Sequence, residues 1–164
     1  MLIWNASPTA QLIFEDIRLP ADALLGERGN AFKDVMKVLD GGRVGIAAMG
    51  LGLGRAAFEY AARYTLGREQ FGKPIGSFQL MQAKVADMYV ALNTARAYVY
   101  EVAKACDAGK VTRQDAAGAV LYASEQAMVQ AHQAVQALGG AGFLNDSVVS
   151  RLFRRSEERR VGKE

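Results

Sequence analysis

The sequence predicts a mainly α-helical fold, an antiparallel four-helix bundle preceded by one β-strand. Apolar residues recur at spacings of three and four from residue 31 onward, which is the period of amphipathic helices. Short connectors containing Gly and Pro divide this pattern into long segments, and a β-prone run precedes it in residues 11–20. With 164 residues, 51% of them hydrophobic, the chain can form a packed core, which excludes a disordered protein.

The first 29 residues differ in pattern from the rest. Residues 11–20 contain a short apolar run, then alternation, then Pro20, which predicts one strand with an exit loop. Gly26 and Gly29 mark a turn region. Because a single strand cannot pair with itself, this strand needs a sheet that the chain does not supply.

The first long helix is predicted from Ala31 to about Leu66, after a cap at Asn30. Each glycine in a helix interior costs up to about 1 kcal/mol relative to alanine. So many glycines in one helix indicate close approach of a ligand or of another helix. The glycines in question are Gly41, Gly42, Gly45, Gly50, Gly52 and Gly54.

A second helix is predicted over roughly residues 78–107, with Ser77 as its N-cap. A third is predicted over about 113–138, because Thr112 and Asp115 have the spacing of a capping box. A fourth, short helix follows residues 145–147. Three helices of this length joined by short loops favour an antiparallel bundle.

Charge and composition exclude several classes of function. The net charge is +3, but residues 151–164 carry six basic and three acidic side chains, so the remainder is neutral. A neutral body argues against a broad nucleic-acid-binding face. Cys106 and His132 are the only cysteine and histidine, which leaves too few ligands for a cysteine or multi-histidine metal site. No apolar run is long enough to span a membrane.

Residues 68–74 form the most informative connector. Arg68 can hold a phosphate, Gln70 can form hydrogen bonds, and Phe71 can stack on a flat ring, which suits a phosphate-bearing aromatic cofactor. From local chemistry alone, a loop with surface charges and one core phenylalanine is the favoured alternative.

Two further glycine-containing segments and one charged pair have two interpretations each. Residues 139–143 either present backbone N–H groups to an anion or form a helix C-cap and turn. The spacing in residues 50–54 does not match a dinucleotide-binding loop, and helix packing explains those glycines better. Asp40 and Arg43 either grip a polar ligand or form an ordinary helical ion pair.

Taken in order, several segments resemble the acyl-CoA dehydrogenase family of flavoenzymes, and most closely its isovaleryl-CoA dehydrogenase-like members. The resemblance covers about residues 7–154. The segments that carry it are Leu12-Ile13-Phe14-Glu15-Asp16, Leu39-Asp40-Gly41-Gly42-Arg43, Arg68-Glu69-Gln70-Phe71-Gly72-Lys73-Pro74-Ile75, Phe78-Gln79 and Gln136-Ala137-Leu138-Gly139-Gly140-Ala141-Gly142-Phe143.

The resemblance implies an FAD-binding role. Arg68, Gln70 and Phe71 match positions that meet the FAD pyrophosphate and adenosine, and Phe78 and Gln79 match positions near the cofactor. Gln136 and Gly140 match an element that contacts the cofactor across a subunit interface, and Asp40 and Arg43 match positions that line the acyl-CoA site.

The resemblance also implies domains, partners and location. Residues 1–29 correspond to the end of a middle β-domain and a linker, residues 30–154 to the C-terminal helical domain, and residues 155–164 to a divergent tail. The parent protein is expected to be a homotetramer that oxidises a short or branched acyl-CoA and passes electrons to an electron-transfer flavoprotein. It is expected in the cytoplasm if bacterial and in the mitochondrial matrix if eukaryotic.

The catalytic glutamate of the family is missing from both positions where members carry it. One position is Gly42, and the family spacing from Gly139 places the other at Lys163. We therefore expect a C-terminal fragment that is inactive by itself and ends in a foreign tail. The alternative is a non-catalytic helical remnant that oligomerises without turnover.

Overall fold

The computed structural model describes residues 10–161, with side chains to Arg155. Four helices are long, and short elements lie between and before them. In chain order the elements are a 3-10 helix η1 (Ala21–Ala23), α1 (Ala31–Gly67), β1 (Glu69–Gln70), β2 (Lys73–Pro74), a 3-10 helix η2 (Ile75–Ser77), α2 (Gln79–Asp107), α3 (Arg113–Leu138), α4 (Gly140–Phe143) and α5 (Val148–Val161).

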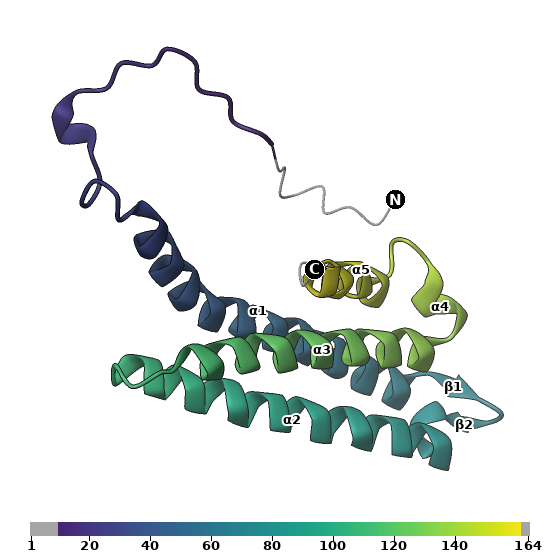
Figure 1. Cartoon of the computed structure of the whole chain (residues 1–164). Coiled ribbons are helices and arrows are strands. Elements are labelled where there is room, and N and C mark those ends of the chain that lie inside the picture. Colours follow the sequence, from purple (N-terminus) through teal and green to yellow (C-terminus); the bar gives the residue numbers. More distant parts are fainter. Residues whose placement is uncertain (1–9, 162–164) are drawn as a thin grey trace.

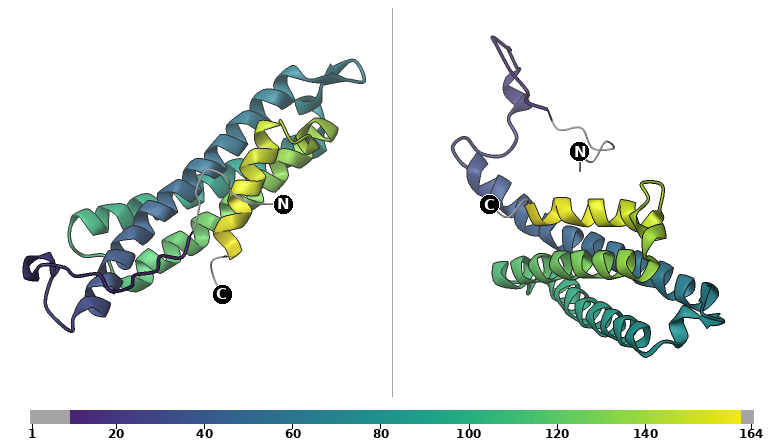
Figure 2. Two further views of the ribbon diagram at one scale, coloured as in Figure 1. Left: turned by 90° about the horizontal axis from the view of Figure 1, so that it is seen from above. Right: turned by 90° about the vertical axis from the view of Figure 1, so that its right-hand side faces the viewer.

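The long helices pack in an up-and-down arrangement, which confirms the predicted fold class (Figure 1). Helices α1, α2 and α3 alternate in direction, so the C-terminal ends of α1 and α3 lie at the same end of the bundle. Helix α5 turns back along α3 and contacts both α3 and α1 (Figure 2). Residues 10–29 extend away from the helices.

The predicted strand in residues 11–16 is wrong for this chain. Residues 10–20 form no regular secondary structure, and Leu12, Ile13 and Phe14 are 73–75% exposed. A strand requires a neighbour for its backbone N–H and C=O groups, and no other segment of the described chain lies beside these residues to pair with them. The observed sheet is instead the small antiparallel hairpin β1–β2, with Gln70 opposite Lys73.

Helices α1 and α3 pack closely along a seam of small residues. At Gly50 an added Cβ would lie 3.2 Å from the carbonyl carbon and oxygen of Ala123, and at Gly54 it would lie 3.4 Å from Gln130 Cγ. An added Cβ at Gly52 meets nothing within 4 Å. Close helix approach therefore explains Gly50 and Gly54, while Gly52 faces open space.

The predicted helix caps have mixed outcomes. Thr112 and Asp115 form the predicted capping box: Asp115 N–H donates to Thr112 Oγ1 at 3.1 Å, and Thr112 N–H donates to Asp115 Oδ2 at 3.3 Å. Ser77 is not the cap of α2, because Phe78 holds that position and the Ser77 hydroxyl donates to the Pro74 carbonyl at 2.7 Å. Asn30 precedes α1 but its side-chain amide donates to Glu27 at 2.8 Å, so it does not cap the helix with its side chain.

Replacing Thr112 by alanine is expected to lower the free energy of unfolding by about 1 kcal/mol, the usual worth of an N-cap side chain. Thr112→Ser keeps the hydroxyl oxygen that accepts from Asp115 N–H. Urea denaturation followed by circular dichroism measures both. Equal losses for alanine and serine would contradict a capping role.

Candidate functional site

A polar hollow of about 470 Å³ lies at the end of the bundle where α1 and α3 finish. It collects side chains and backbone from the β1–β2 hairpin, from the C-terminal turn of α3 and from α4. Its lining residues are Tyr64, Arg68, Gln70, Ile75, Gln136, Ala137, Leu138, Gly139, Gly140 and Ala141. Four predicted cofactor-binding residues, Arg68, Gln70, Gln136 and Gly140, therefore share one site.

The hairpin that follows Arg68 and carries Gln70 depends on an unusual backbone at its tip. Phe71 and Gly72 have φ angles of 55° and 78°, which lie in the left-handed region that glycine tolerates best. The hairpin is fixed to the bundle because Arg68 N–H donates to the Tyr64 carbonyl, and Ile75 N–H donates to the Arg68 carbonyl, each at 2.8 Å.

The other wall of the hollow is the glycine turn that ends α3. Gly139 has a φ angle of 59° and ends the helix, and its N–H donates to the Gln136 carbonyl at 3.2 Å. The helix C-cap interpretation of this turn is thus confirmed. The same turn still contributes its backbone to the hollow, so capping and site formation are compatible.

Hydrogen-bond donors dominate the chemistry of this hollow. Within the described residues, the Arg68 guanidinium has no ion-pair or hydrogen-bond partner. Gln70 Nε2 donates to the Glu69 carbonyl at 2.5 Å, and Gln136 adds a second exposed amide. A guanidinium beside two amides and a glycine backbone suits a phosphate group.

The aromatic residues of the connector lie next to the hollow rather than in it. Phe71 is 93% exposed and meets Phe78 edge-on, with ring centroids 6.2 Å apart. Lys73 Nζ sits 4.4 Å from the centroid of the Phe78 ring, a cation–π contact that sequence reasoning missed. Gln79 is exposed at the first position of α2.

Tyr64 and Ile75 also line the hollow, and sequence reasoning did not select them. Tyr64 lies four residues before Arg68, one helical turn away, which is a usable signal. Ile75 is brought back by the hairpin register and has no such local signal.

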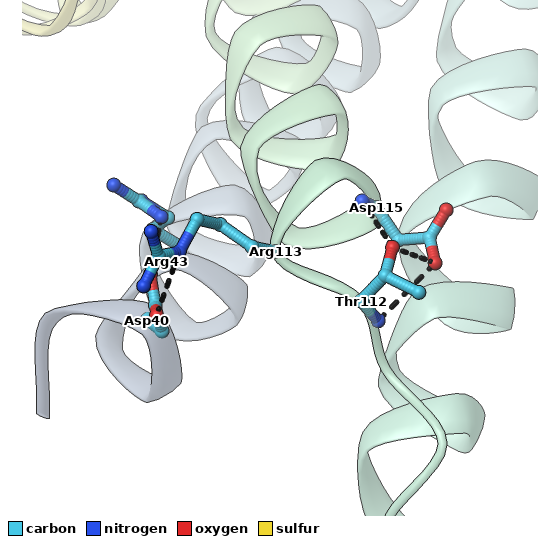
Figure 3. A network of polar contacts seen from close by, with 5 residues as sticks. All are labelled: Asp40, Arg43, Thr112, Arg113 and Asp115. Atoms are coloured by element: carbon cyan, nitrogen blue, oxygen red, sulfur yellow. Dashed lines mark hydrogen bonds and ion pairs between the residues drawn. The ribbon is translucent and has the colours of Figure 1, made fainter. Parts of the chain in front are cut away.

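Asp40 and Arg43 lie far from this hollow, near the start of α1. They precede the hollow by about 27 residues of helix, or roughly 40 Å at the α-helical rise. Figure 3 shows that Asp40 contacts both Arg43 and Arg113, a residue from the first turn of α3. The structure thus separates the two predicted binding regions, and it adds Arg113 to the second.

The remaining candidates support no catalytic or metal site in the described part of the chain. Gly42 is exposed on α1, and Lys163 lies outside the described residues. His132 is exposed, and its ring centroid is 6.3 Å from that of Phe153. Among described residues, no cluster of three or more His, Cys, Asp or Glu side chains could hold a metal ion. No described helix is long and apolar enough to cross a membrane.

This helical fold is the one found in the C-terminal domain of acyl-CoA dehydrogenases. A family model described as the acyl-CoA dehydrogenase C-terminal domain matches residues 29–163. The chain belongs to the acyl-CoA dehydrogenase family.

Relatives of similar identity to the chain are named for different acyl-CoA substrates. The chain is 44% identical to rice mitochondrial isovaleryl-CoA dehydrogenase over 158 residues, covering 96% of this chain and 39% of the relative. It is 46% identical to bovine mitochondrial short-chain specific acyl-CoA dehydrogenase over 150 residues, covering 92% and 36%. The solved butyryl-CoA dehydrogenase of Megasphaera elsdenii superposes with a TM-score of 0.87 at 41% identity, covering 91% and 39%. The chain spans less than two fifths of these relatives.

Proposed function

We propose that the chain is the C-terminal part of an FAD-dependent enzyme that introduces a double bond between the α and β carbons of a short or branched acyl-CoA. The observation that carries this proposal is the shared hollow of Arg68, Gln70, Gln136 and Gly140, residues from two separate chain segments. Relatives named for isovaleryl-CoA and for short-chain acyl-CoA have similar identity to this chain, so the acyl group is stated at that coarser level.

The donor set of the hollow fits the phosphates of FAD. Arg68 supplies a charged donor, Gln70 and Gln136 supply neutral donors, and the glycines at 139 and 140 leave room for close backbone approach. The exposed Phe71, the partly buried Phe78 and Gln79 belong to the adjoining segment, and we propose that they meet the adenosine part of FAD. FAD held by Arg68, Gln70, Gln136 and Gly140 would supply the acceptor for the hydride from the substrate β carbon.

The substrate is proposed to lie near the other end of α1. Asp40 and Arg43 are half-buried there and offer a polar grip for an acyl-CoA. Because Gly42 has no side chain, α1 supplies no carboxylate for α-proton removal at the family position, so we propose that this chain alone does not turn over.

The assembly proposal follows the family resemblance, and the location proposal follows the relatives' names. We propose a homotetramer, with electrons passing to an electron-transfer flavoprotein. A chain in a structure named for the electron transferring flavoprotein of Acidaminococcus fermentans matches with a TM-score of 0.87. The relatives are named as mitochondrial, and we propose the mitochondrial matrix for a eukaryotic source and the cytoplasm for a bacterial one. The domain division at residue 154 stays a prediction, since α5 continues to Val161 and the family match to residue 163.

A second candidate, a helical remnant that associates without catalysis, is favoured by one observation. Large apolar side chains before α1 and in its first turns are exposed to solvent, including Leu25 (96% exposed) and Phe32 (77% exposed). Surfaces of this kind promote association.

An NMR titration of the ¹⁵N-labelled chain with FAD tests the leading proposal. We expect shifts at Arg68, Gln70, Gln136 and Gly140, with Kd raised about tenfold in Arg68→Ala, the cost of one charged hydrogen bond. Arg151→Ala, an exposed arginine on α5, is the matched control and should leave Kd unchanged. Isovaleryl-CoA added to the FAD-loaded chain should not bleach the flavin absorbance. Shifts that avoid the hollow, or equal Kd values for all three chains, would reject the site.

A further inference from the structure

The Asp40 carboxylate bridges two arginines from different helices. Arg43 Nη1 donates to Asp40 Oδ1 from the next turn of α1, and Arg113 Nε donates to Asp40 Oδ2 at 3.2 Å from α3 (Figure 3). Both carboxylate oxygens are thus engaged. The ion pairs Lys37–Asp34, Arg55–Glu59 and Lys104–Glu101 differ, because each stays within one helix.

The part of α1 that carries Asp40 is only partly packed against the other helices. An added Cβ at Gly41, Gly42 or Gly45 would meet nothing within 4 Å, so there is open space beside α1 at these three positions. Val38 and Leu39 are 75% and 53% exposed. The first fully buried residue of α1 is Ala47, and between it and Asp40 the partly buried Val44 packs against the core cluster that contains Ala47.

Arg113, by contrast, lies at a helix end that a capping box stabilises. It occupies the first position of α3, directly after Thr112, whose hydroxyl and backbone N–H both bond the Asp115 carboxylate. The capping box holds the start of α3 in place and engages Asp115 locally. Arg113 therefore reaches across to Asp40 from a rigid helix end.

We propose that Arg113 is a positioning residue that acts on Arg43 through Asp40. By holding Oδ2, Arg113 fixes the carboxylate so that Oδ1 orients the Arg43 guanidinium. Arg43 donates one hydrogen bond to Asp40, and its other N–H groups can donate to an acceptor on the ligand. Asp40 is then a bridge between two cations, and Arg43 is the group that meets the ligand. This assignment rests on the proposed acyl-CoA site only for the identity of that ligand.

The test follows solvent exchange of the Arg43 Nη–H groups, one of which donates to Asp40, by NMR in the whole chain. We expect Arg113→Gln to speed this exchange about threefold, the worth of a partly exposed ion pair, and Arg113→Lys to restore part of the protection. The exposed Arg151→Gln should have no effect. In an Asp40→Asn background, Arg113→Gln should add nothing further, because the bridge is already removed. Unchanged Arg43 exchange in Arg113→Gln, or an undiminished effect in Asp40→Asn, would overturn the inference.

A titration of the same samples with isovaleryl-CoA separates this inference from the proposed function. If Arg43 exchange responds to Arg113→Gln but no resonance near Asp40 responds to isovaleryl-CoA, the positioning role stands and the substrate assignment fails. If isovaleryl-CoA binds near Asp40 but Arg113→Gln leaves Arg43 exchange unchanged, the substrate assignment stands and the positioning role fails.

Discussion

Gly50→Leu is expected to lower the free energy of unfolding by about 3 kcal/mol, at the upper end of overpacking penalties. A Cβ alone at this position would lie 3.2 Å from the carbonyl carbon and oxygen of Ala123, and those are backbone atoms that no rotamer change can move aside. Four leucine side-chain carbons would force α1 and α3 apart along the seam. The gain in helix propensity over glycine, about 1 kcal/mol, does not offset this loss.

Gly52→Leu is the matched control. It lies two residues away on the same helix, and an added Cβ there meets nothing within 4 Å. Only the propensity gain applies, so stability should be unchanged or rise by up to about 1 kcal/mol. Urea denaturation of the three chains gives the comparison. Similar losses for both variants would show that α1 and α3 do not pack through Gly50.

Gly50 and Gly52 also show how much of this fold the sequence can predict. Both lie in one Gly-x-Gly-x-Gly run, and helix period alone places Gly50 and Gly54 on one face and Gly52 on another. Which face meets a partner depends on the position of α3, which is a tertiary property. The capping box at Thr112 was predictable because all of its hydrogen bonds lie within four consecutive residues. The prediction of a strand at residues 11–16 failed because a strand needs a pairing partner, and residues 10–161 supply none.

The sequence predicted the two segments that form the candidate site, but it did not predict that they lie together. Arg68 and Gln136 each belong to a recognisable motif, but 68 positions separate them in the sequence. They meet because α1 and α3 run in the same direction and end at the same level of the bundle (Figure 1). Arg113 had no signal in the sequence beyond its place in the first turn of a helix, since its partner Asp40 lies 73 residues away.

Gln130→Glu is expected to destabilise the chain by about 3 kcal/mol at pH 7, the cost of burying an unpaired carboxylate. Gln130 is 1% exposed, and its Nε2 donates to the Met88 carbonyl of α2 at 2.7 Å. Its Oε1 is buried without a hydrogen-bond partner among the described residues. An ionised glutamate has no N–H to donate to the Met88 carbonyl, and its negative oxygen would be repelled by that carbonyl oxygen. Its charge would also be buried without a partner among the small residues of α1 and α3.

The pH dependence of the Gln130→Glu variant has a definite sign. Burial disfavours the charged carboxylate, so the pKa of the introduced carboxyl group in the folded variant should exceed the unfolded value of about 4.3. The protonated acid donates through its O–H and restores the bond to Met88. The stabilising contribution of the protonated side chain is therefore fully present below the unfolded pKa. It is lost as pH rises from the unfolded pKa through the folded pKa, by up to about 1.4 kcal/mol per pH unit.

Measuring the difference from wild type at each pH, by urea denaturation, cancels the titration of the other groups. Gln114→Glu is the matched control, because Gln114 is exposed in the first turn of α3, where a carboxylate is tolerated or slightly stabilising. Its difference from wild type should stay within about 0.5 kcal/mol across the same range. A Gln130→Glu difference that is flat with pH would mean that the side chain reaches solvent. The link between α2 and α3 through Met88 would then contribute little to the bundle.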